Sequence, residues 1–522
     1  LRKEPLMESR DAHSSARECP AKLLSIVGCS LFAAAALLAA PPEPRYEAYS
    51  IASPWGPPML AAKLGRIQVL ENRASGSPRV IELAFVRIPA TVSKPAAPIL
   101  WLSGGPGASA TGDLQTPALE LFLELRRLAD VVVLDQRGTG LSVPRLDCPG
   151  TIRFPLEVAT DRQRATDALE GSARACADRW RAEGVDLSAY NVRESAEDIE
   201  DLRKALGAPK LRILAGSWGT HLALAAIRAH EATIERAALI GVVGPDHLYG
   251  SPADMESGLA RVSEIARRDP NVATSLPDPL NAARRAIERL RREPRTVNLP
   301  ASDGGTIAVA VGSYELEWYL RSLLTSSDTI SHVPAFLAAL EAGDLRELAV
   351  VAFHWRSAPA PPASVFAARC ASGASPARLA RIERESRESM LGETTSYADE
   401  RVCRALGVAP LPDPYRAAVV SAVPALFVSG TLDGDTPESN AIEVSRGFAN
   451  AELLSIENAP HTLLGFTDGA ARTAIARFLE GKSPKASRLA LSAITFERPT
   501  QAAGGGLSLA AGGATPLFPA AP

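Results

Sequence analysis

The sequence shows no marked excess of charge of either sign, no metal-binding cysteine pattern and, beyond its first 40 residues, no long apolar run. Its 522 residues include 56 basic and 59 acidic side chains, a net charge of −3, so nothing overall favours nucleic acid or an anionic membrane as a partner. No Cys-x-x-Cys pair and no Cys/His cluster of metal-ligand spacing occurs, which argues against structural zinc. We therefore expect neither a metal ion nor nucleic acid among its ligands.

The composition is that of an ordinary folded protein rather than a disordered or fibrous one. Apolar residues make up 46% of the chain and charged residues 22%. A chain of 522 residues corresponds to about three domain-sized units, or to one large domain with insertions.

The N-terminal region has the layout of a secretory signal peptide. A polar stretch with several arginines precedes an uncharged run of eighteen residues, Leu23–Ala40, and two prolines follow. This order predicts that residues 1–42 are a signal peptide and leader and that the protein is periplasmic or secreted. An uncleaved membrane anchor is the minor alternative, because the run lies at the short limit for spanning a bilayer. We expect no stable membrane insertion after signal cleavage.

Four cysteines lie beyond the predicted leader, an even number that in an exported chain suggests two disulfides. Four cysteines allow three pairings, and pairing of sequence neighbours is favoured: Cys148 with Cys176, and Cys370 with Cys403. Buried free thiols are the alternative.

Short apolar runs alternate with stretches of helical spacing such as Ser195–Leu206. The runs lie at Pro98–Leu102, Asp130–Leu134, Leu211–Ala215 and Ala237–Val243, after two earlier strand-like segments at Arg66–Leu70 and Val80–Ile88. Continuous apolar strands separated by helices indicate an α/β fold with a mostly parallel central sheet and helices on both faces.

The pattern changes to successive helices between residues 245 and 404, and strand character then returns. We therefore predict an α/β core in two parts, 46–244 and 405–490, interrupted by a helical lid, 245–404. The lid should cover the strand ends and carry specificity. A Gly-, Ala- and Pro-rich end predicts a flexible tail over 491–522.

Ser217 is the candidate nucleophile. It lies in the stretch AGSWG (215–219), directly after a predicted strand and before a predicted helix, Thr220–Arg228. A nucleophile elbow needs this layout, because small residues two positions before and after the serine let the strand and helix approach. Without that context, such a string would equally indicate an ordinary Ser/Gly turn.

A serine nucleophile needs a histidine base, and the chain has only seven histidines. His461 lies just after the last predicted strand, Glu452–Ile456, in a loop that an α/β-hydrolase sheet places beside the nucleophile. The other six lie in the leader, on the helix after Ser217, or in or near the lid: His13, His221, His230, His247, His332 and His354. We therefore predict that His461 is the general base.

The third member of a triad should orient the imidazole and lie between the serine and the histidine in the sequence. Asp433 is the first Asp after the predicted strand Pro424–Ser429 and is our choice, with Asp435 as the alternative. A turn-forming Asp is the competing interpretation of either residue. The order Ser217, Asp433, His461 is that of the α/β-hydrolases.

An acyl-transfer site also needs hydrogen-bond donors for the oxyanion. The backbone N–H of Trp218 would supply one, and a Gly-rich loop after an earlier strand usually supplies the other. Ser103–Gly107 (SGGPG) fits this role, with Gly105 or alternatively Gly104 presenting its N–H. A phosphate-binding loop is disfavoured, because no Lys-Ser/Thr follows and the proline removes a donor.

Five motifs in this order resemble those of the proline iminopeptidase and tripeptidyl aminopeptidase family of serine peptidases. They are SGGPG (103–107), DQRGTGLS (135–142), AGSWG (215–219), GTLDGDTP (430–437) and the final His461. The resemblance runs from Val69 to His461, and the four cysteines also resemble those of the exported tripeptidyl branch. Two departures are Ser103, where iminopeptidases often have His, and Ala215, where they have Gly.

The resemblance implies an α/β-hydrolase fold, release of residues or short peptides from a free N-terminus, and no metal or organic cofactor. The expected partners are therefore peptides with a free N-terminus. The family binds the substrate amine through acidic lid residues, for which Glu315 and Glu317 are loose candidates, beside Asp246, Asp254 and Glu256. Solvated surface charge is the competing interpretation of each.

The sequence as a whole predicts a serine exopeptidase with an acyl-enzyme intermediate. Ser217 would attack the peptide carbonyl, His461 would transfer the proton and Asp433 would hold the imidazole. Two alternatives stay open: a carboxylesterase of the same fold acting on small acyl esters, and an inactive binding relative.

Overall fold

The computed structural model describes residues 43–52, 59–152, 154–301, 303–394, 400–463 and 468–498. The predicted leader, and the predicted tail after residue 498, lie outside these ranges. Among the residues described, no helix is both long and apolar enough to cross a lipid bilayer.

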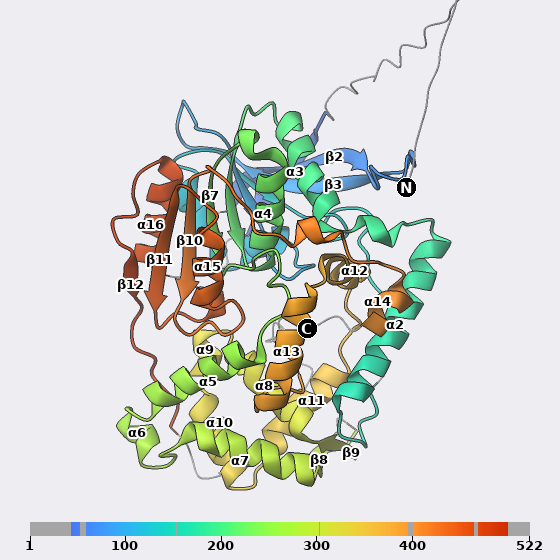
Figure 1. The fold of residues 1–522 in the computed structure, drawn as a ribbon, viewed down its shortest axis with the longest axis vertical. Coiled ribbons are helices and arrows are strands. Elements are labelled where there is room, and N and C mark those ends of the chain that lie inside the picture. The colour runs from blue at the N-terminus through green and yellow to red at the C-terminus, as the bar shows by residue number, and fades with distance from the viewer. Residues whose placement is uncertain are drawn as a thin grey trace, which may run out of the picture. The chain divides into compact units, whose positions relative to one another are not determined.

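Ten strands of the described chain form one sheet at the centre of the core (Figure 1). Their order is β1 (Arg45–Ile51), β2 (Leu60–Leu70), β3 (Val80–Ile88), β5 (Val131–Leu134), β4 (Ile99–Leu102), β6 (Leu211–Gly216), β7 (Ile234–Ile240), β10 (Ala425–Gly430), β11 (Ala451–Glu457) and β12 (Arg488–Ala490). The pairs β1–β2, β2–β3 and β3–β5 are antiparallel, and each pair from β5–β4 to β11–β12 is parallel. The prediction of a mostly parallel sheet is therefore confirmed.

Helices cover both faces of this sheet, and its central strands β4 and β5 are apolar and buried along their whole length. One face carries α1 (Ala118–Leu125) and α16 (Gly469–Glu480), and the other carries α3 (Val192–Ala205), α4 (Trp218–His230) and α15 (Glu438–Ser445). In β5, Val131 and Val133 belong to the hydrophobic cluster on the α1 and α16 face. Val132 and Leu134 belong to the cluster on the face of α3, α4 and α15. Since successive side chains point to opposite faces, such a strand must be buried on both.

Repeated Ser-Pro and Asp-Pro pairs define where several lid helices begin. In four helices, a Ser or Asp side chain accepts a hydrogen bond from the first turn and proline takes the first helical position. These are α5 (Pro252–Ala266), α6 (Pro270–Ala273), α7 (Pro279–Arg292) and α13 (Pro376–Glu388). The others described are α8 (Ser313–Leu323), α9 (Ser327–Ile330), α10 (Val333–Glu341), α11 (Arg346–Arg356), α12 (Ala363–Ser372) and α14 (Glu400–Leu406).

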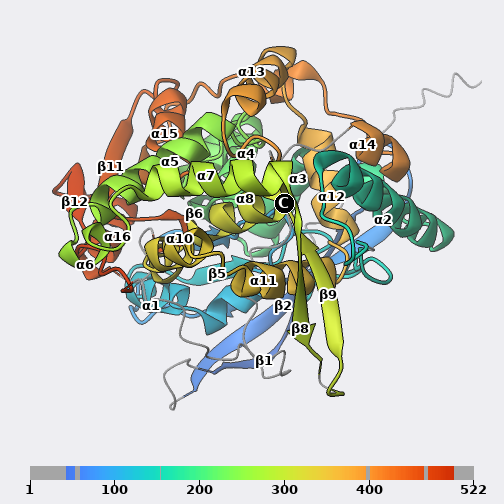
Figure 2. The same ribbon diagram turned by 90° about the horizontal axis from the view of Figure 1, so that it is seen from below.

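A β-hairpin that the sequence pattern does not predict interrupts these helices. Its strands, β8 (Arg295–Pro300) and β9 (Thr306–Val311), pair antiparallel and project from the lid (Figure 2). Because β8 is exposed along most of its length, it lacks the continuous apolar run that marks the core strands. Apart from this hairpin, the regular secondary structure described between residues 245 and 404 is helical.

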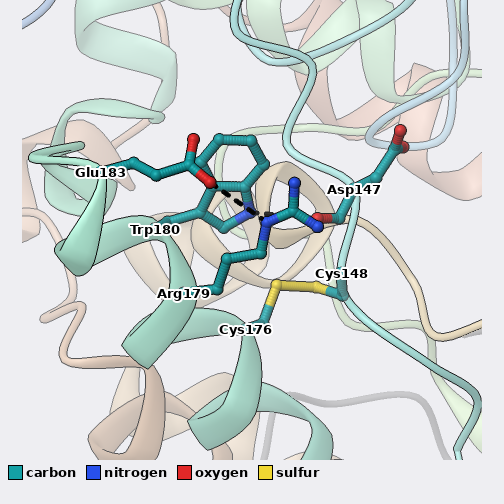
Figure 3. Close-up of a disulfide and its surroundings, with 6 residues drawn as sticks. All are labelled: Asp147, Cys148, Cys176, Arg179, Trp180 and Glu183. Carbon is teal, nitrogen blue, oxygen red and sulfur yellow. Dashed lines mark hydrogen bonds and ion pairs between the residues drawn. A yellow bond between two sulfur atoms is a disulfide. The ribbon is translucent and has the colours of Figure 1, made fainter.

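Two disulfides join neighbouring segments of the chain. Cys148–Cys176 ties a loop to α2 (Arg162–Ala182), as Figure 3 shows, and Cys370–Cys403 ties α12 to α14. Both pairings are the predicted ones. Helix α2 packs against α12 and α14, so this part of the first core segment joins the lid.

The first residues of the predicted flexible tail are packed against the lid, contrary to expectation. Phe496 is 5% exposed and belongs to the hydrophobic cluster of the lid. The ring nitrogens of His332 contact Glu497 and Glu347 at 2.6 and 2.8 Å, and the backbone N–H of Glu497 donates to Ser331. Residues 491–498 therefore form an ordered extension, because one apolar side chain and its ionic neighbours find partners far away in the sequence.

Candidate active site

Ser217 occupies a strained turn between β6 and α4. Its φ of 51° and ψ of −125° are uncommon for a residue with a side chain. A Cβ on Gly219 would lie 2.1 Å from the carbonyl oxygen of Leu102, so only glycine lets the helix pass the neighbouring strand. The turn therefore has the geometry of a nucleophile elbow at the carboxyl end of β6.

His461 lies between Ser217 and Asp433. Its Nε2 is 3.1 Å from Oγ of Ser217, and its Nδ1 is 2.9 Å from Oδ2 of Asp433. Because a carboxylate can only accept, the proton belongs on Nδ1, which leaves Nε2 to accept the serine hydroxyl. The structure thus brings together the three predicted side chains from three separate segments of the core.

The charge on Asp433 governs the protonation of His461. Burial alone would lower the pKa of His461, but the Asp433 carboxylate outweighs this effect and raises the pKa to about 9. Burial would likewise raise the pKa of Asp433, yet His461 and hydrogen bonds from Thr436 hold it below its usual value. The site therefore stabilises an imidazolium, the form that appears when the serine proton is taken.

Two residues around this pair were not singled out in the sequence, Thr436 and Gly241. The Thr436 N–H donates to Oδ1 of Asp433 at 2.8 Å, and its hydroxyl donates to Oδ2. Gly241 has a φ of 61°, and a Cβ there would lie 3.4 Å from Cε1 of His461. The Thr-Pro pair after Asp433 is the available sequence signal. The alternative carboxylate, Asp435, also raises the pKa of His461, but its effect is smaller than that of Asp433.

The loop Ser103–Gly107 lies against the nucleophile. A Cβ on Gly104 would lie 3.1 Å from Cβ and 3.6 Å from Oγ of Ser217. Gly105 has a φ of 110°, in the region that favours glycine. Trp218 is the first residue of α4, so its N–H has no carbonyl partner within the helix. Both predicted sources of oxyanion donors therefore adjoin Ser217.

The DQRGTGLS motif anchors the segments around this loop. Buried Asp135 accepts a hydrogen bond from the N–H of Thr111 at 2.9 Å, and a Cβ on Gly140 would lie 2.2 Å from its carboxylate. Arg137 donates two hydrogen bonds of 2.7 Å to Asp198 in α3. The motif, which follows β5, therefore holds the segment at Thr111 and helix α3 in one arrangement.

Glu315 is buried at the start of α8 and bonded to groups of the lid and the adjoining loop. It is 1% exposed, forms an ion pair with buried Arg356, and accepts hydrogen bonds from the N–H groups of Gly312 and Thr160 at 2.7 and 2.8 Å. These partners engage both carboxylate oxygens, which leaves none exposed to bind the amine of a substrate.

Glu317 is also buried within the lid. It accepts hydrogen bonds from Arg291 at 3.1 Å and from the N–H of Glu393 at 2.8 Å. Burial, together with the nearby Glu393 carboxylate, raises the pKa of Glu317 to about 8, which disfavours the charged form that amine binding needs. The remaining candidates also have partners within the lid: Asp246, Asp254 and Glu256.

Replacing Glu315 by Gln is expected to lower the free energy of unfolding by about 3–5 kcal/mol, because it leaves the Arg356 charge buried without its partner. Denaturant unfolding measures this loss. Glu264→Gln, which breaks an exposed pair with Arg268, should cost less than about 1 kcal/mol. If Glu315→Gln instead kept full stability and selectively weakened substrates with a free amine, Glu315 would be the amine-binding residue.

The chain matches the model of the alpha/beta hydrolase fold over residues 97–466. Over 176 residues it is 28% identical to the putative hydrolase YuaR of Escherichia coli (strain K12), and this part amounts to 32% of each protein. The chain therefore spans about a third of the length of this curated relative.

Solved structures with a similar fold include a proline iminopeptidase from Mycobacterium smegmatis, with 15% identity over 77% of this chain and 95% of that one and a TM-score of 0.37. They also include a thermophilic esterase from Thermogutta terrifontis, with 17% identity over 80% and 98% of the two chains and a TM-score of 0.33. The family model covers more than half of the sequence, and the sheet and helices have the corresponding arrangement. This protein belongs to the α/β hydrolase fold family.

Proposed function

We propose that the protein is a serine exopeptidase that releases residues or short peptides from the free N-terminus of a peptide. The observation that carries the serine-hydrolase part is the line of contacts from Ser217 Oγ through the His461 ring to Asp433, at 3.1 and 2.9 Å. A serine at an elbow, a histidine within reach of its hydroxyl and a buried carboxylate behind the histidine are what nucleophilic acyl transfer needs.

In the proposed mechanism, Ser217 Oγ attacks the carbonyl carbon while Nε2 of His461 takes its proton. The oxyanion forms in front of Trp218 N–H and the loop at Gly104 and Gly105. His461 then protonates the leaving amine, and water, activated by the same imidazole, hydrolyses the acyl-enzyme. Asp433 stays ionised and stabilises the imidazolium in both halves of the reaction.

The preference for peptides rests on the motifs rather than on the triad. SGGPG and DQRGTGLS, combined with AGSWG, resemble those of the proline iminopeptidase and tripeptidyl aminopeptidase family. Here SGGPG adjoins the nucleophile, and DQRGTGLS fixes the segments around it. A free N-terminus is the expected feature of the substrate.

A carboxylesterase of the same fold is the second candidate, and a specific observation favours it. The carboxylates first considered for amine binding, Glu315 and Glu317, are buried and bonded within the described structure. An esterase needs no such carboxylate, because its substrate carries no ammonium group.

The two candidates differ in how they respond to blocking the substrate amine. An exopeptidase should hydrolyse a free aminoacyl or tripeptidyl p-nitroanilide about 10–100-fold better, in kcat/KM, than its N-acetyl form, because a charge-assisted hydrogen bond contributes about 1.5–3 kcal/mol. An esterase should hydrolyse p-nitrophenyl acetate readily and neither anilide. That second pattern would overturn the exopeptidase proposal.

We also propose that the protein is exported, because two disulfides are stable chiefly outside the cytoplasm. Expression of the full chain in a Gram-negative host, followed by fractionation and N-terminal sequencing, should recover a shortened chain in the periplasm or medium. An intact N-terminus in the cytosolic fraction, with the four cysteines of the two disulfides present as free thiols, would contradict export.

A further inference from the structure

The donors of the proposed oxyanion hole come from two segments that are far apart in the sequence, the loop Ser103–Gly107 after β4 and Trp218 after β6. Their effect depends on placement, because a donor stabilises the oxyanion only where charge develops and a small displacement forfeits much of it. The covalent chain does not hold these segments together directly. The pairing of β4 with β6 ends at Leu102 and Ala215, so contacts beyond it must fix the loop against Trp218.

Gln136 lies between the two segments and bonds to both. Its Nε2 donates to the carbonyl oxygen of Ser103 at 3.1 Å, and the indole Nε1 of Trp218 donates to its Oε1 at 3.2 Å. Both hydrogen bonds are buried, and Gln136 is 8% exposed. An indole N–H can only donate and a carbonyl can only accept, so just one orientation of the amide satisfies both partners.

The hydrogen bond from Gln136 to the Ser103 carbonyl affects the oxyanion hole through the peptide group between Ser103 and Gly104. The carbonyl of Ser103 and the N–H of Gly104 belong to the same planar peptide group, so fixing the carbonyl fixes the direction of that N–H. The N–H of Gly105 belongs to the next peptide group, which joins this plane at the Cα of Gly104. Gln136 thus holds the start of the donor loop with one end of its amide and the side chain of Trp218 with the other.

The backbone of Gln136 is itself immobilised. Its carbonyl accepts hydrogen bonds from the hydroxyl and the N–H of Thr139 at 2.9 and 3.0 Å. Its neighbours Asp135 and Arg137 are buried and anchored to other segments. The amide is therefore carried on a rigid turn, as accurate positioning of a second group requires.

We propose that Gln136 is a positioning residue of the oxyanion hole, whose side-chain amide sets the separation between the Ser103–Gly107 loop and Trp218. This inference rests on the proposed function, because it needs Ser217 to be the nucleophile. It assigns a role in the reaction to a DQRGTGLS residue beyond the anchoring done by Asp135 and Arg137.

The test compares Gln136→Met and Gln136→Glu with the wild-type protein. Methionine has a similar shape and offers neither donor nor strong acceptor, whereas glutamate keeps the acceptor for Trp218 but has no donor for Ser103. Asn72→Leu is the matched control, because Asn72 is also 8% exposed and its amide bonds to Asp186 and to the N–H groups of Ala74 and Ser75, none of which belongs to the donor segments. Thermal unfolding is recorded for every variant.

Two measurements depend on stabilisation of the oxyanion rather than on overall folding. They are kcat and KM for p-nitrophenyl acetate, and the rate constant for labelling of Ser217 by a fluorophosphonate. Both Gln136 variants should lose about tenfold or more in kcat and in labelling rate, with KM changed less than about twofold. Asn72→Leu should keep the wild-type kcat and labelling rate, even if its unfolding temperature falls as far as those of the Gln136 variants.

Wild-type rates in both Gln136 variants, or equal losses in Asn72→Leu at equal folded fraction, would overturn the proposal. Mass spectrometry of the labelled wild-type protein keeps this outcome separate from failure of the proposed function. A label on Ser217 supports the nucleophile whatever the Gln136 variants do. No label on Ser217 would refute the proposed function and, with it, the role of Gln136.

Discussion

Ser217→Ala is expected to lower kcat by roughly a millionfold, the scale seen when the nucleophile of a triad is removed. The alanine side chain has no atom that can form the acyl-enzyme. His461→Ala should cost about as much, since triad members act as a unit. Turnover of p-nitrophenyl acetate and of an aminoacyl p-nitroanilide, with active-site titration of the wild type, measures the loss.

Ser263→Ala supplies a matched control for this experiment. Ser263 is a buried serine of α5, and its hydroxyl has no hydrogen-bond partner among the described residues. Its replacement should leave kcat within about twofold, since the hydroxyl has no hydrogen bond to lose among the described residues. Turnover retained in Ser217→Ala but lost on treatment with a chelator would show that a different reaction centre is at work.

Asp433→Asn is expected to lower kcat by about 10⁴-fold while leaving the fold intact. An amide of the same shape can present its N–H₂ to Nδ1, which turns the His461 tautomer so that Nε2 carries the proton and cannot accept one from Ser217. The same substitution removes the carboxylate that raises the pKa of His461 to about 9. The pKa of His461 should therefore fall.

The pH dependence follows from this shift. The base form of His461 is needed for attack, so kcat/KM of the wild type should rise as the pH increases from about 6.5 towards about 9. In Asp433→Asn, the weak remaining activity should reach its plateau at a lower pH. Initial rates in overlapping buffers give both profiles, and a profile for the variant that is shifted to higher pH would contradict the assigned contact.

Asp435→Asn distinguishes the two carboxylates of the GTLDGDTP segment. Asp435 carries a charge close enough to influence His461, but the 2.9 Å contact to the ring is made by Asp433. Its replacement should change kcat by less than about tenfold. A larger loss in Asp435→Asn than in Asp433→Asn would reverse the assignment.

The strands and the elbow were predictable because their signals are local. A parallel strand buried on both faces is mostly apolar; β4 and β5 are wholly so, and β6 and β10 each carry only one polar side chain, Arg212 and Ser429. The turn around Ser217 requires small neighbours, and Gly219 meets that requirement within five residues of sequence. The pairing of cysteines close in sequence was found in the same way.

The lid was predicted only in outline. Ser-Pro and Asp-Pro pairs mark where several of its helices begin. Strand β8, by contrast, has no apolar run and is defined by its pairing with β9. The packing of Phe496 depends on lid helices more than a hundred residues earlier, so composition alone made residues 491–498 look like part of a flexible tail. Charged side chains were the hardest to assign, because Glu315 looks like any helix-surface carboxylate until Arg356 is placed beside it.

The sequence by itself therefore predicted the fold class, which the structure confirms, and proposed the elbow at Ser217 with Asp433 and His461 as its partners, because strand burial, backbone sterics and chain order leave local signals in the sequence. The tertiary structure decided what surrounds them. Thr436 and Gly241 beside the Asp433–His461 pair, and Gln136 between the two donor segments, act through hydrogen bonds and close approaches between distant segments. Apart from the Thr-Pro pair that marks Thr436, a single sequence has no periodic or compositional signal for such contacts, since they depend on which segments the fold brings together.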